Sequence, residues 1–185
     1  MNAADEKLVE YLRTAYAQEM GLVRTLQAHT EMSHDGEYKK QLQHHLTETV
    51  GHARKLRERL DELGYLADEN VVQRTIGTVQ SLATQMLAIA KGPYDVIRGK
   101  GDVAETMLKN ARDEAMTEAS EIATYIALER MAENLGDKET AAIAREIRQD
   151  EEQMLEKLAG LIRGLTDEVV SSQVMSRPAA IRKAS

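Results

Sequence analysis

The sequence predicts an all-α protein, a four-helix bundle made of two antiparallel hairpins and a long crossover between them. The chain has 185 residues, of which 42% are apolar, and contains only two Pro and no Phe, Trp or Cys. Its apolar residues are mostly Ala, Leu, Ile, Val and Met, a mixture that favours helix over sheet. Four long segments also repeat apolar residues at helical spacing, and short Gly-containing breaks separate the members of each pair.

The first predicted hairpin covers residues 3–28 and 37–63. Residues 33–36 (Ser-His-Asp-Gly) break the first helix, and Gly64 follows the second, where a C-terminal stop residue is expected. Because the break is short, the two helices should lie side by side and antiparallel. The residues expected to face inward are Leu8, Leu12, Ala15, Leu22 and Leu26, then Leu42, Leu46, Thr49, Ala53, Leu56, Leu60 and Leu63.

The second predicted hairpin covers residues 102–135 and 137–165. Asp102 opens the third helix with Glu105 at its third position, Gly136 stops it, and Asp137 caps the fourth. The residues expected to face inward are Ala104, Leu108, Ala111, Ala115, Ile122 and Ile126, then Ala144, Ile147, Leu158 and Leu161.

Residues 64–101 are too many for a tight turn, and an amphipathic pattern over 76–90 predicts a short extra helix inside them. A connection of this length can carry the chain back along the bundle, which gives a ferritin-like topology. We therefore expect a ferritin-like bundle over residues 1–165. The periodicity is lost over 166–185, which we interpret as a partly helical or disordered tail.

Composition excludes several classes of function. Without Cys there can be no disulfide scaffold, thiolate metal site or iron–sulfur cluster. The net charge of −7 argues against general nucleic-acid binding. No apolar run is long enough for a membrane span, and the first ten residues lack the pattern of a secretory signal. A cytoplasmic location is the expectation.

Each predicted helix carries a Glu on or beside its apolar stripe: Glu19, Glu48, Glu118 and Glu151. A single such residue usually flanks the stripe and reaches solvent. The two members of each hairpin, however, are equidistant from its turn, so all four should meet near mid-height. Carboxylates gathered in an apolar core must either hold protons or bind divalent cations. Glu48 is the weakest placement, at the edge of its stripe, and His52 lies nearer the core.

Four strings resemble the YciE/YciF-type ferritin-like family, which is related to rubrerythrins, over most of the chain from Leu12 to about Leu161. They are residues 16–19 (Tyr-Ala-Gln-Glu), 45–52 (His-Leu-Thr-Glu-Thr-Val-Gly-His) with Leu63-Gly64, 118–125 with 132–136, and 150–158. The second and third strings are the more specific.

The resemblance implies a bundle with an added short helix, often dimeric and associated with stress responses. It implies a di-metal site on Glu19, Glu48, Glu118 and Glu151, with Glu121 as an extra carboxylate. Two departures stand out: His52 replaces a common Gln, and Leu155 stands where an acidic residue is expected.

Several neighbouring residues have two readings. His52 is a candidate imidazole ligand, and His45, seven residues earlier, is either a ligand or a polar contact at the rim. Glu121 is either a labile ligand or a surface carboxylate paired with Lys or Arg. Tyr16 and Tyr125 could orient carboxylates or supply electrons, although packing tyrosines are commoner. His29, His34 and His44 are expected to be solvated.

The leading hypothesis is therefore a ferritin-like protein that binds a divalent metal, iron or manganese before zinc, through Glu19, Glu48, His52, Glu118, Glu121 and Glu151. Oxygen or peroxide chemistry of an oxidase or peroxidase type would fit such a site. One alternative is a non-catalytic, helical-bundle stress protein whose core glutamates are protonated or hydrated, or whose metal site is degenerate or structural. A DNA-protecting role for the tail, with Arg177, Arg182 and Lys183, is weaker.

Overall fold

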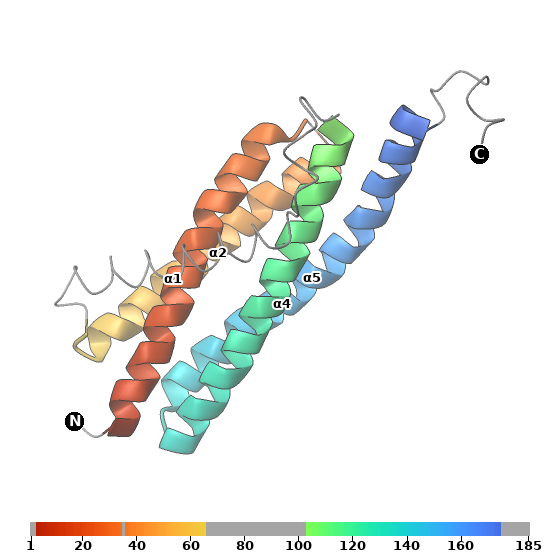
Figure 1. Ribbon diagram of the computed structural model, residues 1–185. Helices are drawn as coiled ribbons and strands as arrows, with labels where there is room; N and C mark the ends of the chain where they lie inside the picture. Colours follow the sequence, from red (N-terminus) through yellow and green to blue (C-terminus); the bar gives the residue numbers. More distant parts are fainter. Residues whose placement is uncertain (1–2, 35, 66–102, 175–185) are drawn as a thin grey trace.

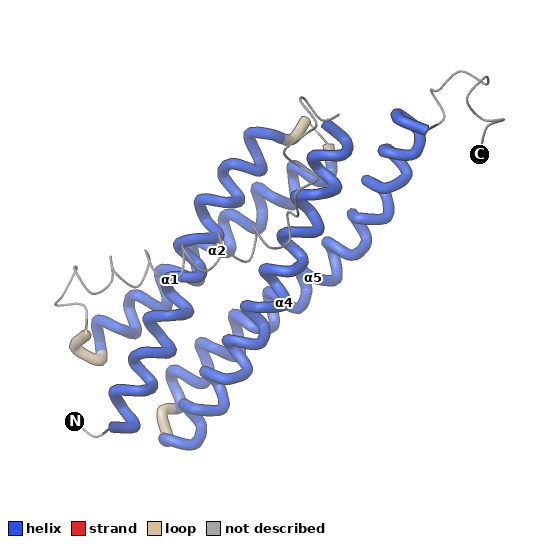
Figure 2. Tube along the Cα trace, viewed as in Figure 1, coloured by secondary structure: helices blue, strands red, loops and turns tan. Residues whose placement is uncertain are grey.

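The computed structural model describes residues 3–34, 36–65 and 103–174, which form four long helices (Figure 1). These are α1 (Ala3–Met32), α2 (Glu37–Glu62), α4 (Val103–Leu135) and α5 (Lys138–Val169), and a π-helical turn, η1 (Val170–Val174), follows α5. The trace shows the helices lying lengthwise against one another, with short turns inside each pair (Figure 2). The predicted all-α fold class is confirmed.

The order of the helices around the bundle is that of two hairpins joined by a long connection. α1 lies beside α2 and α4, and α5 lies beside α4 and α2. Tyr65, just after α2, accepts a hydrogen bond from Arg13 Nη2 near the start of α1 (3.2 Å). Met107, near the start of α4, packs instead with Leu26 from the far end of α1. α2 and α4 are therefore parallel, and residues 66–102 must connect opposite ends of the bundle. The extra helix expected at 76–90 lies outside the described residues.

Glycines end α2 and α4, as predicted. Gly64 and Gly136 have φ of 80° and 75°, a left-handed conformation that L side chains rarely adopt. After α2, Tyr65 N donates to Leu60 O (2.9 Å) and Gly64 N to Asp61 O (2.8 Å), and the same pair of bonds recurs around Gly136. This is the Schellman arrangement, which satisfies the last carbonyls of a helix.

Two helices are longer than predicted. α1 continues past residue 28 to Met32, and α5 continues past residue 165 to Val169 before the turn at Val170–Val174. Part of the region interpreted as a tail is therefore helical. Residues 175–185, with their basic groups, lie outside the described part of the chain, so the division into a bundle and a tail stays a prediction.

The inward stripe of α4 differs from the predicted one by one residue. Ala104 and Ala111 are buried as predicted, but Ile126 is 53% exposed and Ile122 is only half-buried. The observed stripe follows strict three- and four-residue spacing through Ala104, Met107, Ala111, Glu114, Glu118, Glu121, Tyr125, Leu128 and Ala132. The prediction placed isoleucines inside because apolar residues normally are, whereas here carboxylates and a tyrosine occupy those positions.

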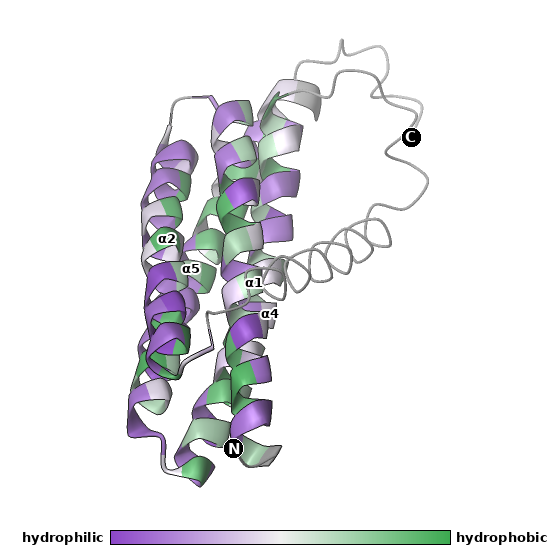
Figure 3. Ribbon diagram, turned by 90° about the vertical axis from the view of Figure 1, so that its left-hand side faces the viewer, coloured by the Kyte–Doolittle hydropathy of each residue, from purple (hydrophilic) through white to green (hydrophobic). Residues whose placement is uncertain are grey.

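The core consists of two apolar clusters. One lies toward the start of α1 and contains Leu12, Leu56, Leu60, Leu128 and Ile147, among others; the second lies toward the start of α4 and contains Leu22, Leu26, Leu42, Met154 and Leu158. Figure 3 shows hydrophobic (green) and hydrophilic (purple) segments alternating along the helices. Within the described ranges, no helix has the length and apolarity of a membrane span.

Asp137 caps the first turn of α5 and also ties it to α2. Its carboxylate accepts from Thr140 N (3.0 Å) and Thr140 Oγ1 (2.7 Å), and also from Arg59 Nη2 of α2 (2.9 Å). Burial opposes ionisation, but these bonds outweigh it and lower the pKa of Asp137. Asp137→Ala should therefore lower the free energy of unfolding by about 1–2 kcal/mol, measured by urea denaturation.

Asp137→Asn keeps a good capping oxygen and should lower the free energy of unfolding by less. The difference between the two variants therefore distinguishes the contribution of the cap from that of the ion pair with Arg59. The Asp137 contribution is present above the ordinary Asp pKa and disappears as pH falls through the lowered value. Equal stability of Asp137→Ala and wild type would contradict this role.

Candidate metal centre

A layer of buried polar side chains separates the two apolar clusters. It contains Glu19 from α1, His45, Thr49 and His52 from α2, Glu118 and Glu121 from α4, and Glu151 from α5. All of these side chains are at most 2% exposed. Each lies on the inward stripe of its helix, at the positions that aliphatic residues fill above and below. The helical spacing that builds the core therefore also holds the polar layer in place.

Two groups of three ligand atoms form within this layer. Glu19, His52 and Glu151 form one, and His45, Glu118 and Glu151 form the other. Within each group, all the nitrogen and oxygen atoms lie within 4.8 Å of one another. Glu151 belongs to both groups, so its carboxylate stands between two clusters of donors from four helices.

His52 has one ring nitrogen directed into the first group and the other directed out of it. Its Nδ1 lies 2.9 Å from Glu151 Oε1 and 3.8 Å from Glu19 Oε2, without the alignment of a hydrogen bond. Its Nε2 lies 3.2 Å from Asp150 Oδ2, a half-buried carboxylate next to Glu151 in the sequence. A carboxylate behind an imidazole is the usual outer support of a metal-ligating histidine.

His45 repeats this arrangement in the second group. Its Nε2 lies 2.9 Å from Glu118 Oε1, and its Nδ1 lies 4.0 Å from Glu48 Oε2. Burial lowers the pKa of His45 to about 4, so its ring is neutral at pH 7 and has a lone pair to donate. His52 differs, because the nearby Glu151 and Glu19 outweigh burial and raise its pKa to about 10.

The carboxylates of this layer are short of hydrogen-bond donors. Among the described residues, none donates a hydrogen bond to either oxygen of Glu121 or to the second oxygens of Glu19 and Glu118. Burial, with the neighbouring carboxylates, raises the pKa of Glu118, Glu121 and Glu19. Glu151 differs, because His52 and Glu118 outweigh burial and lower its pKa. Unpartnered buried oxygens are costly in a protein unless something else binds them.

Of the predicted site residues, five lie in the layer and one does not. Glu19, His52, Glu118, Glu121 and Glu151 are brought together, whereas Glu48 is 28% exposed and lies beside His44 Nε2 (3.3 Å). The prediction paired Glu48 with Glu19 about a turn centred between Ser33 and His34. In the structure the α1–α2 pair across the layer is Glu19 and His52, which places the centre of symmetry about two residues later.

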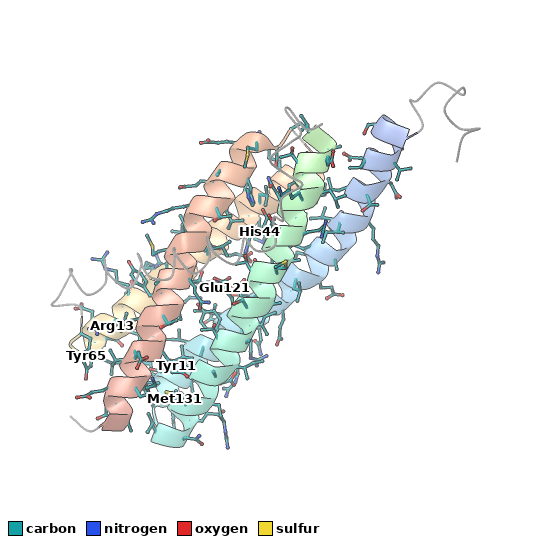
Figure 4. The ribbon with its side chains drawn as sticks, in the orientation of Figure 1. Tyr11, Arg13, His44, Tyr65, Glu121 and Met131 are labelled. Carbon is teal, nitrogen blue, oxygen red and sulfur yellow. The ribbon has the colours of Figure 1, made fainter. Side chains whose placement is uncertain are left out.

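Glu121 is not a surface carboxylate. Its side chain is 1% exposed and lies between the helices at mid-bundle (Figure 4). The sequence signal that could have found His45 is the register of α2. Tyr38, Leu42, His45, Thr49, His52 and Leu56 continue one stripe at alternating four- and three-residue spacing, and Glu48 lies off it.

Tyr125 lies next to this layer, at the edge of the first apolar cluster, and its hydroxyl donates a hydrogen bond to Glu19 Oε1. Of the readings left open for Tyr125, this contact favours the one in which the hydroxyl orients a carboxylate. Tyr16 is half-buried and packs against the same apolar cluster.

The chain matches the family described as "Domain of unknown function (DUF892)" over residues 3–171. Among curated proteins it aligns with the DNA-directed RNA polymerase subunit β′ of Chloroflexus aggregans at 38% identity over 78 residues. That alignment covers 42% of this chain and only 5% of the polymerase subunit, so it shows no shared function.

Three solved structures share the fold. A protein from Xanthomonas campestris pv. campestris has a TM-score of 0.71 at 22% identity, covering 93% of this chain and 99% of that one. The stress protein YciF of E. coli has a TM-score of 0.64 at 19% identity, covering 90% of this chain and 99% of that one. A ferritin-like, diiron-carboxylate protein from Bacillus anthracis has a TM-score of 0.59 at 20% identity, covering 88% of this chain and 99% of that one. At these identities the likeness is one of fold. With residues 3–171 matched and the ferritin-like bundle in place, this chain belongs to the DUF892 family, and its resemblance to the YciF-type ferritin-like proteins is confirmed.

Proposed function

We propose that the polar layer binds two divalent metal ions, one in each group of donors, with Glu151 between them. The observation that carries this proposal is that two buried three-residue groups from four helices share one carboxylate. Glu19 and His52 would hold one ion and His45 and Glu118 the other. Glu121 would supply a further carboxylate, and Glu48 would support His45 from its outer side.

The donor inventory supports this assignment. Di-iron and di-manganese carboxylate bundles use a Glu from each of two helices and a Glu-x-x-His pair from each of the other two, which amounts to four glutamates and two histidines. This layer contains the same six donors in another distribution: Glu19, Glu118, Glu121 and Glu151, with His45 and His52 both on α2. On α5, Met154 and Leu155 follow Glu151 where the histidine of a Glu-x-x-His pair would be expected. α2 carries two histidines, so the number of histidine donors in the layer is the same.

Oxygen and imidazole donors suit iron, manganese and zinc, and a pair of iron or manganese ions would supply redox chemistry toward oxygen or peroxide. The protein's own contribution is to place the donors, exclude water from them, and hold protons on the carboxylates until a metal ion binds. The Bacillus anthracis neighbour is described as a diiron-carboxylate protein and YciF as a stress protein, which supports a stress-related role for a metal centre of this kind. Oxidase or peroxidase-type chemistry and a cytoplasmic homodimer are further parts of the proposal and come from the sequence alone.

A non-catalytic bundle with protonated core glutamates is the second candidate. The raised pKa values of Glu118 and Glu121 favour it, because neutral carboxyls can be buried without metal. A DNA-protecting role has less support, since it depends on the basic tail beyond residue 174.

Metal analysis and thermal unfolding distinguish the two candidates. Full-length protein purified without chelator should contain iron or manganese, and its melting temperature should fall with chelator and recover with Fe²⁺ or Mn²⁺. Protein that contains no metal and melts unchanged after addition of either ion would exclude the metal centre and leave the non-catalytic bundle.

Tyr125→Phe tests the support of Glu19. Loss of the hydroxyl removes a hydrogen bond that orients this carboxylate, and changes of this kind typically weaken metal binding by about 10–100-fold. The measurement is Mn²⁺ or Co²⁺ affinity by isothermal titration. Tyr16→Phe is the matched control and should bind as wild type; equal affinity of both variants and wild type would show that the Tyr125 hydroxyl has no such role.

A further inference from the structure

A second buried polar cluster lies one helical turn from the metal centre, toward the start of α4. Its central residue is Glu114, which is 1% exposed and precedes Glu118 by four residues on the same stripe. His29 of α1 and Tyr38 of α2 contact it, and Asn110 is buried on the preceding turn of α4. His29 was expected to be solvated, but its side chain is only 12% exposed.

The two oxygens of Glu114 have unequal surroundings. Oε1 lies 2.5 Å from His29 Nδ1 and accepts a hydrogen bond from Tyr38 (3.1 Å). Oε2 is buried and, among the described residues, receives no hydrogen bond, and the buried donor Asn110 Nδ2 finds no acceptor among them. Burial raises the pKa of Glu114, although His29 and Tyr38 act against it. A carboxylate placed here only to pair with His29 would leave one oxygen unsatisfied in an apolar cluster, which is unfavourable.

This arrangement repeats the one at Glu118. There too, a histidine nitrogen from another helix lies against one oxygen (His45 Nε2, 2.9 Å), and the second oxygen has no partner among the residues described. A histidine nitrogen and a carboxylate with a vacant oxygen are donor types that divalent transition-metal ions take.

We propose that His29 and Glu114 form a second, outer divalent-cation site through which the metal centre is loaded. The contacts of His29 and Glu114 described above support binding at this outer site. Its role in loading also rests on the proposed function, because it requires a metal centre to be loaded. His29 reaches solvent, whereas the donors of the metal centre are at most 2% exposed. Along α4, Glu114, Glu118 and Glu121 follow one another at axial steps of about 6 Å and 4.5 Å. An ion held at the outer site therefore has a carboxylate one turn further in to receive it.

The test follows each histidine nitrogen as the full-length, metal-free protein is titrated with Zn²⁺, which is redox-inert and spectroscopically silent. In ¹⁵N-histidine-labelled protein, coordination shifts the resonance of the bound nitrogen itself. We expect Zn²⁺ to shift Nδ1 of His29 as well as the ring nitrogens of His45 and His52. Glu114→Gln should remove the His29 shift and leave the other two. His34→Gln, at an exposed histidine (51%), is the control and should change neither.

Loading is measured with Co²⁺, whose visible absorption reports binding at the centre. Glu114→Gln and His29→Gln should each slow the rise of this absorption several-fold, while the centre still fills. Circular dichroism checks that each variant is folded. Because two variants are compared with wild type, a folding defect in one of them does not determine the result.

The outcomes separate the two proposals. If His45 and His52 shift but His29 does not, the outer site is excluded and the metal centre stands. If none of the three shifts, the outer site is excluded together with the metal centre. If His29 alone shifts, the outer site stands without its loading role, and unchanged Co²⁺ rates in both variants would likewise exclude that role.

Discussion

Glu151→Gln is expected to abolish the stabilisation of the protein by Fe²⁺, Mn²⁺ or Co²⁺. Glu151 belongs to both groups of donors, so its replacement by an amide weakens two metal positions at once. A ligand at 100 times its dissociation constant stabilises the folded state by about 2.7 kcal/mol. For a chain of this size that corresponds to a rise in melting temperature of roughly 5–10 °C, and the variant should lose nearly all of it.

Two further variants make this result specific. Glu118→Gln affects only the second group and should leave the first able to bind, so the metal content should fall by about half. Glu152→Gln alters an exposed neighbour that pairs with Arg148 and should respond to metal as wild type does. A full metal-dependent rise in Glu151→Gln would show that the shared carboxylate does not bind metal.

The fold could be predicted from the sequence because helix ends and hairpins depend on local signals. Gly64, Gly136 and Asp137 act within one turn of their own helix, and the stripe of α1 consists of residues that are buried as expected. The topology followed from the length of the segment between the hairpins. α1 continues four residues beyond its predicted end, up to the predicted break at Ser33, whose hydroxyl donates a hydrogen bond to His29 O in the last turn of the helix (2.7 Å).

The site was harder to predict because its residues break the rule that locates a core. On α4 an apolar stripe displaced by one residue competes with the true one, and Ile126 is more hydrophobic than Tyr125 beside it. On α2 the preference for carboxylates as metal ligands favoured Glu48, whereas the register of the helix turns His45 and His52 inward. A strict alternation of three- and four-residue steps, applied without regard to polarity, would have placed His45, Glu114 and Glu121 inside.

A buried layer of this kind reduces the stability of the bundle whenever metal is absent. Two apolar clusters hold the helices together on either side of it. Between them, carboxyl groups are buried close together and several of their oxygens lack donors among the described residues, so ionisation of this layer opposes folding of the metal-free protein. The sensitivity of stability to metal and pH is therefore concentrated in a few residues, among them Glu121, neither of whose oxygens has a hydrogen-bond partner among the described residues.

Glu121→Gln is accordingly expected to stabilise the metal-free protein. The side chain is 1% exposed, both oxygens lack hydrogen-bond partners among the described residues, and burial, then Glu19 and Glu151, raise its pKa well above the ordinary value. Removing an ionisable group from such a place should raise the free energy of unfolding in chelator by about 1–3 kcal/mol. The same change removes a donor, so the gain in stability on adding metal should become smaller. A purely structural residue would not produce opposite effects in the two states.

The pH dependence of the metal-free protein provides the second readout. A glutamate whose pKa is higher in the folded than in the unfolded state binds more protons when folded, so stability falls as pH rises through the interval between the two values. His52, with its pKa raised to about 10, acts in the same direction above pH 6.5, while His45 titrates below that range. Between pH 6.5 and 9, urea unfolding in chelator should therefore show stability decreasing with pH, less steeply in Glu121→Gln than in wild type.

Glu129→Gln on the same helix, which loses ion pairs to Arg145 and Arg148, is the control and should lower stability without changing the slope. If Glu121→Gln is less stable than wild type and the two free energies of unfolding change with pH at the same slope, Glu121 is a stabilising residue of the core and not a metal donor.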